Sequence, residues 1–434
     1  MGEKIKLFIG HYHLHTCGVT RIIQSQVASA IYLNKIDGIF ILSSGDSDIS
    51  QLNQKIIKNI GLNYLKMDIS KNESFKIEKK MLAFVKNKVR KNDIIHFHNH
   101  NLGKNPILTI ILFKLAEEGY KIVFHCHDFA EDREENYNFL KKIIHEYFSL
   151  DLKKTMYPDY QNCFYITLQK YDYKRLINYG LNKNRIKVIP NPVNFQDNII
   201  MDKEESKKVL FNVFGIQDDF PVFLYPVRVI RRKNIGEFIL LAALFQNEAL
   251  WMITLPPKNP VEIIEYNKWK FFCDEYKIKI YFEINEKVDF ITSMNASYKI
   301  VTTSIKEGFG MSFLEPWMFN KQVVGRDISI ITKDFKKNNL KLNGLYKILN
   351  VLNNNRTKID FAGLNIEEQM SLIKTILHDE KLKEYIINKN NLKKILFSDI
   401  DYDLIEHNKK IIKEKYSIKN FGNSLNEIYE RLLK

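Results

Sequence analysis

Histidines gather in the segments DIIHFHNHN and KIVFHCHDF, which hold His96, His98, His100, His125 and His127 of the 11 histidines in the chain. Side chains two residues apart on a strand point to one side, and three or four converging imidazoles can bind zinc. Cys126 points away from its two neighbours and could not readily join them as a ligand. The alternatives are a zinc site formed by two strands, or two strand ends at which one histidine faces a ligand.

A second candidate is KEGFGMSFLEPW at 306–317, which follows the apolar run YKIVTTS. Glu307 lies on a turn, and Glu315 lies on a helix expected to begin near Gly310. The turn GFG would leave backbone amides free to donate to an oxygen-rich ligand. Two carboxylates and such amides beside cations suit a sugar nucleotide, because carboxylates accept from hydroxyls and cations hold phosphates. The alternative is an ordinary helix cap at the surface.

Cations and a glycine follow two other apolar runs. Arg228 ends FPVFLYPVR, and Lys233 opens the next helix, so the two could clamp a diphosphate with the help of the helix dipole. The alternative is solvated surface charge. Gly18 directly precedes a helical segment after HYHLHTC, where a phosphate could approach a helix N-terminus. The alternative there is an ordinary tight turn.

Short apolar runs separated by helical periodicity must position these residues. Such runs indicate parallel strands covered on both faces. The alternation extends from 5–10 to 186–190, and it restarts at 220–228 after PNPVNFQDN (190–198), which resembles a linker. In the second half, strands are expected at 249–255, 278–282, 298–304 and 322–327, and helices near 235–246, 261–276 and 310–319. From about 366 onward the pattern is mainly that of amphipathic helices.

Length and composition limit the class of protein. The chain has 434 residues, enough for two domains, and a formal net charge of +15. Two readings of the charge stay open: a lysine-rich composition, or a basic surface for nucleic acid or anionic lipid. Since no basic block alternates with aromatic residues, we expect no nucleic-acid partner. Four dispersed cysteines and apolar runs too short for a bilayer lead us to expect a cytoplasmic protein.

Several of these segments, in this order, resemble the retaining GT-B glycosyltransferases of family 4. The matching features are Glu307 and Glu315 separated by seven residues, Arg228 and Lys233 separated by four, VIPNPV (188–193), and the strand ends DIIHFHN and FHCHD. The resemblance covers nearly the whole chain. It implies two Rossmann-like doubly wound parallel-sheet domains facing across a cleft. Their expected limits are 1–195 for acceptor binding, 196–410 for the nucleotide sugar, and 411–434 for a C-terminal helix crossing back to the first domain.

The resemblance also implies roles for single residues. Arg228 and Lys233 would neutralise the departing diphosphate, and Glu307 would accept hydrogen bonds from the donor sugar. Glu315 would bind the ribose, and Gly18 would let its loop touch the distal phosphate. The backbone amides of Phe309, Gly310 and Met311 would donate to the donor sugar, and His127 would lie against that sugar near the reacting carbon. The residues expected on the acceptor side are His15, His100 and Asp128.

The expected reaction is transfer of a hexose from a UDP- or GDP-sugar to a hydroxyl acceptor, such as a saccharide, a small polyol or acid, or a lipid-linked glycan. No metal or other cofactor is expected, and peripheral contact with an anionic membrane stays open. Cys17 and Val227 stand where the family commonly has glycine, so this sequence departs from the family pattern at two positions that concern the approach of the phosphates. The alternatives are a sugar-nucleotide epimerase or phosphorylase of the same fold and, more remotely, a basic protein that binds nucleic acid or membranes.

Overall fold

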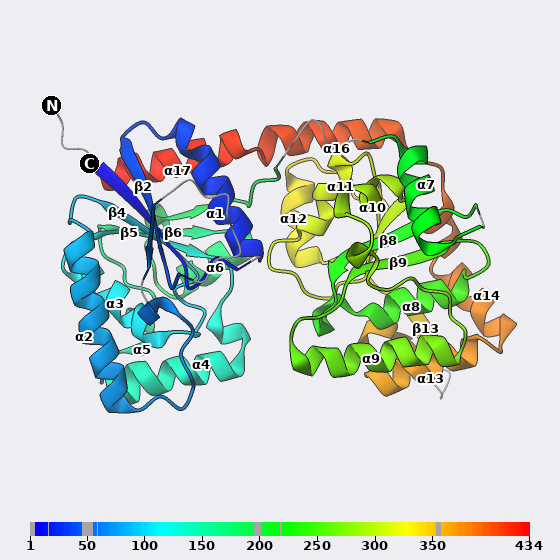
Figure 1. Ribbon diagram of the computed structural model, residues 1–434, viewed down its shortest axis with the longest axis horizontal. Helices are drawn as coiled ribbons and strands as arrows, with labels where there is room; N and C mark the ends of the chain where they lie inside the picture. Colours follow the sequence, from blue (N-terminus) through cyan, green and yellow to red (C-terminus); the bar gives the residue numbers. More distant parts are fainter. Residues whose placement is uncertain are drawn as a thin grey trace. The chain divides into compact units, whose positions relative to one another are not determined.

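The computed structural model describes residues 5–15, 17–45, 55–58, 60–194, 201–217, 219–352 and 357–434. The chain forms two compact units, Met1–Asn194 with Tyr416–Lys434, and Phe195–Lys415 (Figure 1). The limits expected from the sequence stand at 195/196 and 410/411, so the two divisions differ most where the chain returns to the first unit. Residues 195–198 of the predicted linker lie outside the described residues.

The first unit is built on a seven-stranded sheet in the order β3-β2-β1-β4-β5-β6-β7, parallel at every pairing. Its strands are β1 (Ile5–Gly10), β2 (Ile36–Ser43), β3 (Lys55–Lys58), β4 (Ile94–His98), β5 (Lys121–Cys126), β6 (Cys163–Thr167) and β7 (Ile186–Val188). The strand order reverses between β1 and β4. In open parallel sheets, ligands bind beyond the carboxyl ends of the strands at such a point.

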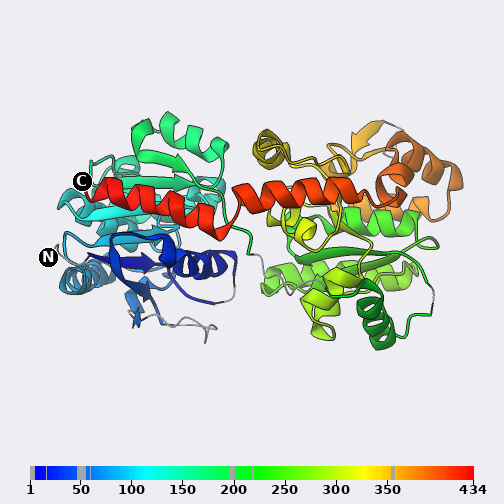
Figure 2. The ribbon, with the colours of Figure 1, turned by 90° about the horizontal axis from the view of Figure 1, so that it is seen from above.

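Helices cover both faces of this sheet. They are α1 (Gly18–Ala28), η1 (Ser29–Tyr32), η2 (Ile60–Leu62), α2 (Lys71–Lys88), α3 (Pro106–Glu117), η3 (Ala130–Asp132), α4 (Glu134–Lys141), η4 (Lys142–Tyr147), α5 (Leu152–Met156), α6 (Lys170–Asn178), η5 (Lys183–Arg185) and α17 (Ile418–Leu432). In one core, helices α2, α3, α4, α5 and α6 pack against side chains of the sheet such as Phe124. The other joins α1 and α17 to alternate side chains such as Val123. Figure 2 shows the red α17 running along this unit.

The second unit contains a five-stranded parallel sheet in the order β12-β11-β10-β8-β9 and a separate antiparallel hairpin. Its strands are β8 (Val222–Arg228), β9 (Leu250–Leu255), β10 (Lys299–Thr302), β11 (Val323–Arg326), β12 (Leu345–Tyr346), and β13 (Asn350–Leu352) with β14 (Lys358–Asp360) of the hairpin. Because the sheet is parallel, the carboxyl ends of β8 and β10 lie at the same edge.

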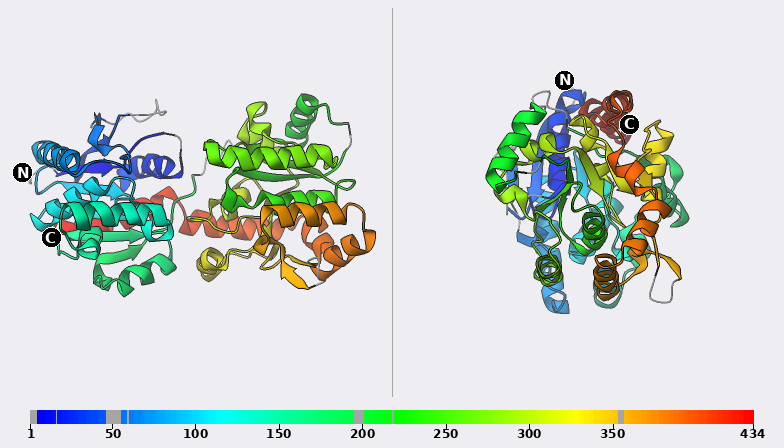
Figure 3. Two further views of the ribbon diagram at one scale, coloured as in Figure 1. Left: turned by 90° about the horizontal axis from the view of Figure 1, so that it is seen from below. Right: turned by 90° about the vertical axis from the view of Figure 1, so that its right-hand side faces the viewer.

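Its helices again lie on both faces of the sheet (Figure 3). They are α7 (Lys203–Phe214), η7 (Arg231–Lys233), α8 (Ile235–Leu244), α9 (Pro260–Glu275), η8 (Ile284–Glu286), α10 (Phe290–Ala296), η9 (Met311–Phe313), α11 (Glu315–Met318), α12 (Ser329–Lys337), η10 (Phe361–Gly363), α13 (Ile366–Ile376), α14 (Glu380–Lys389), α15 (Leu392–Phe397) and α16 (Tyr402–Lys415). Phe223 and Trp251 pack with α8, α9 and α13, whereas Leu224 and Met252 face α7 and α10.

Two predicted elements differ from the structure. The strand expected at 278–282 is only an isolated bridge between Tyr281 and Met252. The helix expected at 310–319 is interrupted: η9 ends at Phe313, and the four-residue α11 begins at Glu315 with Pro316 in its first turn. A proline at this place lacks an amide hydrogen for a longer helix. Among the described residues, the structure has no helix long and apolar enough to cross a membrane.

Candidate functional site

In the first unit, His98 ends β4 and His127 follows the last residue of β5. His98 pairs with His125 across the two strands, so alternate side chains of both strands point to one face. On this face lie the imidazoles of His96, His98, His125 and His127, with centroids of contacting rings 4.2–5.3 Å apart. We call these four residues the histidine cluster.

Hydrogen bonds join the histidine cluster to α1 and α17. His127 Nε2 lies 2.8 Å from His98 Nδ1, and His98 Nε2 lies 2.8 Å from Gln26 Oε1. Gln26 Nε2 donates to the hydroxyl of Tyr429 over 2.8 Å. A polar path therefore runs from the end of β5, through β4, to the last helix of the chain.

The same hydroxyl continues the path to the interior strands. It lies 2.7 Å from His96 Nδ1, and His96 Nε2 lies 3.1 Å from His125 Nδ1. Burial lowers the pKa of His96 to about 3, and it also lowers the pKa of His127 to about 3. The imidazoles are therefore neutral at pH 7, and each can donate from one nitrogen and accept at the other.

Asn99 fixes the backbone on which His127 stands. It adopts a left-handed conformation with φ 61°, and its amide donates to the carbonyl of His125 over 2.9 Å. Its Oδ1 accepts hydrogen bonds from the backbone amides of His127 (2.8 Å) and Asp128 (3.0 Å). Asparagine tolerates this conformation better than most residues. The position of His127 is thus set by both its backbone and its ring.

His100 lies apart from His127. Its ring packs 4.3 Å from that of Phe124, on the opposite face of the sheet, and its Nε2 lies 2.8 Å from the carbonyl oxygen of Met156. The side chain is fully buried. A contact between this imidazole and an acceptor would need the interior to open, so we leave His100 out of the proposed site.

The other residues expected on the acceptor side lie at the ends of β1 and β5. His15 is exposed, with its ring 5.0 Å from that of His13, and the hydroxyl of Tyr64 lies 3.3 Å from His13 Nε2. Asp128 accepts from Arg133 Nη2 over 2.9 Å.

Gly18, which is expected to let its loop touch the distal phosphate, begins α1 and is exposed. A Cβ at this position would meet no atom within 4 Å.

Two groups of described side chains could bring three metal-binding atoms within 4.8 Å of one another: His96, His98 and His125, and His11, His13 and Cys17. In the first group, hydrogen bonds already engage both ring nitrogens of His96 and of His98. An ion there would have to replace these bonds. The geometry of the first group therefore suits a hydrogen-bonded network better than a metal centre.

In the second unit, the carboxyl edge of the sheet holds the predicted clamp. Arg228 ends β8, and its Nη1 donates to the carbonyl of Pro256 over 2.7 Å. Lys233 ends η7 and forms an ion pair with Glu307, with side-chain exposures of only 13% and 8%. Burial lowers the pKa of Lys233, and the carboxylate of Glu307 opposes that shift. A cation and a carboxylate, both expected to touch the donor, are thus direct neighbours.

Hydrogen bonds hold the two loops of this pair together. The hydroxyl of Tyr225, a residue of β8, donates to the carbonyl of Lys233 over 2.8 Å and lies 2.7 Å from Ser304 Oγ. Thr303 Oγ1 donates to the same carbonyl over 3.1 Å. The amide of Ile305 donates to the carbonyl of Arg232 over 3.0 Å. These side chains were not predicted from the sequence.

The GFG turn needs one of its glycines. Gly310 has φ 89°, and a Cβ there would lie 2.9 Å from side-chain atoms of both Ile331 and Phe313. Phe309 is buried against Phe335, with ring centroids 5.4 Å apart. Met311 begins η9, so the three amides named from the sequence lie at the start of that turn.

Glu315 is the first residue of α11 and is half-buried. It is separated from the turn by η9, so it does not share one continuous helix with Gly310 as expected.

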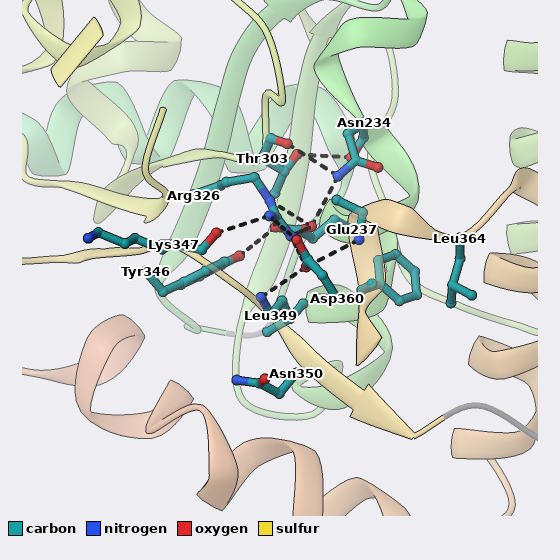
Figure 4. A network of polar contacts seen from close by, with 12 residues as sticks. Asn234, Glu237, Thr303, Arg326, Tyr346, Lys347, Leu349, Asn350, Asp360 and Leu364 are labelled. Atoms are coloured by element: carbon teal, nitrogen blue, oxygen red, sulfur yellow. Dashed lines mark hydrogen bonds and ion pairs between the residues drawn. The ribbon is translucent and has the colours of Figure 1, made fainter. Parts of the chain in front are cut away.

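A buried network of ion pairs and hydrogen bonds includes Asn234, the residue after Lys233 (Figure 4). Arg326, at the end of β11, donates to Glu237 from Nε (3.0 Å) and to Asp360 from Nη1 and Nη2 (2.8 Å each). Tyr346 donates to Glu237 over 2.9 Å. Asn234, beside Lys233, donates to Glu237 over 3.0 Å. The sequence holds a feature from which this network could have been predicted, because Glu237 is the single acidic residue of the apolar helix IGEFILLAAL. Such a residue needs a buried partner.

Comparison with solved structures defines the class. A glycosyltransferase from Rickettsia africae matches with a TM-score of 0.64 and 15% identity, and the match covers all of both chains. HepE from Anabaena, solved in complex with UDP and glucose, matches with a TM-score of 0.59 and 13% identity over 98% of each chain. WaaG, a glycosyltransferase involved in lipopolysaccharide biosynthesis, matches with a TM-score of 0.53 and 12% identity over 94% of this chain and 99% of its own. The fold is that of GT-B glycosyltransferases.

A sequence relative narrows the class. Mannosylglucosyl-3-phosphoglycerate synthase from Petrotoga mobilis is 30% identical over an alignment of 417 residues, and the match covers 92% of this chain and 78% of that protein. The chain belongs to the GT-B glycosyltransferase family of this synthase. No family model matches the chain.

Proposed function

We propose that this protein is a retaining hexosyltransferase of family 4, which moves a hexosyl group from a UDP- or GDP-sugar to a hydroxyl of a small anionic glycoside. The ion pair between Lys233 and Glu307, at the carboxyl edge of the second sheet in a chain of a glycosyltransferase family, carries the proposal. In this pair an ammonium, which can bind phosphate, lies next to a carboxylate, which can accept hydrogen bonds from sugar hydroxyls, and a nucleotide sugar offers both kinds of group.

Arg228 and Lys233 would hold the diphosphate. An ammonium has three donors and a guanidinium has five, so each cation can keep its present partner and still donate to phosphate oxygens. Their charge would stabilise the negative charge that develops when the glycosidic bond breaks. Glu315 would accept from the ribose hydroxyls, and the amides of Phe309, Gly310 and Met311 would donate to the sugar.

Residues of the first unit would orient the acceptor and the reacting carbon. His127 would meet the donor sugar, and the acceptor hydroxyl would attack on the side from which the diphosphate leaves. A phosphate oxygen would take the proton of that hydroxyl. The protein would then contribute orientation and charge stabilisation rather than a nucleophile.

The anionic acceptor is inferred from the relative, whose name specifies a glycosylated 3-phosphoglycerate. In this chain, Arg133 and the exposed His15 lie near the strand ends of the first unit. These groups can donate to phosphate or carboxylate oxygens. We therefore propose glucosyl-3-phosphoglycerate or a chemically similar glycoside as the acceptor, with His15, Arg133 and Asp128 on its side.

The test is a thermal-shift screen with UDP- and GDP-sugars, followed by transfer assays with glucosyl-3-phosphoglycerate. A donor present at about one hundred times its Kd should stabilise the protein by about 2.7 kcal/mol. NMR of the product should show the anomeric configuration of the donor. Inversion of that configuration would contradict the retaining mechanism, and no transfer to any phosphorylated glycoside would contradict the acceptor.

An epimerase or phosphorylase of the same fold is the competing activity. Incubation of the protein with donor alone distinguishes an epimerase, because epimerisation needs no acceptor. Formation of an isomeric nucleotide sugar without acceptor would replace the transferase assignment.

A further inference from the structure

A path of hydrogen bonds ends at His127. The direction of these bonds determines which ring nitrogen of His127 carries the proton. The members of the path are His127, His98, Gln26, Tyr429, His96 and His125, in the order in which they are linked. His127 is 8% exposed, whereas the side chains of the other members are at most 1% exposed. The path therefore opens toward the surface only at His127.

The amide of Gln26 sets the direction. Its Oε1 faces His98 Nε2, and its Nε2 donates to Tyr429. A neutral imidazole that donates from Nε2 must accept at Nδ1. His98 Nδ1 therefore accepts the hydrogen bond from His127 Nε2, and the remaining ring nitrogen of His127, Nδ1, carries a lone pair.

The hydroxyl of Tyr429 accepts from the Nε2 end of the Gln26 amide and so leaves Oε1 toward His98. This hydroxyl lies 2.7 Å from His96 Nδ1, to which it can donate while it accepts from Gln26. Without this hydroxyl, the amide could rotate and donate to His98 Nε2 instead. The proton of His98 would then sit on Nδ1 and would be donated to His127 Nε2, so the proton of His127 would move to Nδ1.

We propose that Gln26 and Tyr429 are positioning residues that hold His127 in the tautomer with a proton on Nε2 and a lone pair on Nδ1. The last helix of the chain thereby controls the hydrogen-bonding character of a residue at the end of β5. The inference rests on the proposed function in one respect: the group that Nδ1 accepts from is a hydroxyl of the donor sugar. Because burial keeps the imidazoles neutral, each ring has one donating and one accepting nitrogen, and the orientation of the Gln26 amide sets the direction of the links to His98 and His127.

The experiment measures the tautomer directly, by NMR of protein labelled with 15N-histidine, with His127 assigned from the signals lost in His127→Gln. In the wild type, Nδ1 of His127 should have the shift of an unprotonated nitrogen. In Tyr429→Phe, that signal should move toward the shift of a protonated nitrogen, and kcat should fall by about tenfold or more. The matched control is Tyr165→Phe, which removes a buried hydroxyl that donates to the carbonyl of Pro158 over 2.9 Å in the same unit.

Tyr165→Phe should leave the tautomer and kcat near their wild-type values. A protonated Nδ1 in the wild-type protein would overturn the inference, and so would a Tyr429→Phe protein with the wild-type tautomer. If Tyr429→Phe does not fold, the wild-type measurement alone decides. If the wild type has the expected tautomer and Tyr429→Phe shifts it, but the protein transfers no sugar, the proposed function is contradicted while the control by Gln26 and Tyr429 stays supported.

Discussion

The ammonium of Lys233 lies against the carboxylate of Glu307, 74 residues further along the chain. Each residue follows a strand of the same parallel sheet, and the loops that carry them are joined by bonds from Tyr225 and Thr303. The pair is almost closed off from solvent. Under the proposed function, a nucleotide sugar would meet a cation and a hydrogen-bond acceptor already fixed in position, which would lower the entropic cost of orienting it.

Replacing Lys233 with alanine should lower kcat by orders of magnitude, because the departing diphosphate loses a buried counter-charge. Initial-rate assays with saturating donor measure this effect. Lys270→Ala is the control, since Lys270 forms a more exposed ion pair with Glu283 in the same unit. Wild-type turnover of the Lys233 variant would exclude its role as the diphosphate clamp.

Replacing Gly310 with alanine should weaken donor binding and destabilise the protein by about 1–2 kcal/mol. The reasons are the left-handed backbone and the 2.9 Å approach to Ile331 and Phe313. Calorimetric titration with the nucleotide sugar and urea unfolding measure the two effects. Gly308→Ala should change neither much, because a Cβ at Gly308 has no atom within 4 Å. Equal effects of both substitutions would argue against a specific demand at Gly310.

Replacing Arg326 with methionine should destabilise the protein by about 3–5 kcal/mol, because Glu237 would be left buried without its charged partner. Chemical denaturation measures the loss. In Arg185→Met, which removes a partly exposed pair with Asp159, the loss should be at most about 1 kcal/mol. Similar losses in the two variants would show that burial of the network does not control its contribution.

Lys321 should make the stability depend on pH. Its ammonium is buried and donates to the carbonyls of Asn295 (2.7 Å) and Ser297 (2.6 Å), and burial lowers its pKa from 10.5 to about 7. Between these two values the unfolded state binds more protons than the folded state. The free energy of unfolding should therefore rise with pH in this window, by at most about 1.4 kcal/mol per pH unit.

The measurement for Lys321 is a series of urea unfolding curves between about pH 7 and pH 10. Lys321→Met keeps the apolar stem and removes the titrating group, so its stability should rise less steeply than that of the wild type. Parallel profiles for the two proteins would contradict the assignment of the rise to Lys321.

Much of the fold could be predicted because apolar runs and helical periodicity are local signals. The strands predicted in YKIVTTS and KIVFHC are observed as β10 and β5. Glu307 and His127 follow the carboxyl ends of these strands within a few residues. Predictions from weak local patterns were wrong. The strand predicted at 278–282 is a single bridge, and the four-residue strand Lys55–Lys58 was not predicted. Pairing with neighbouring strands, not local hydrophobicity, decides such cases.

The sequence by itself determined which residue types end the strands, because a parallel sheet covered on both faces leaves its carboxyl edge as the place for polar groups. Only the tertiary structure decided their partners. In the tertiary structure, Lys233 pairs with Glu307, and His100 lies on the opposite face of the sheet from His127. His98 is connected through Gln26 to Tyr429, which lies 403 residues after Gln26. Periodicity assigns a side chain to a face of its own element. Contacts between distant elements arise only when those faces pack together.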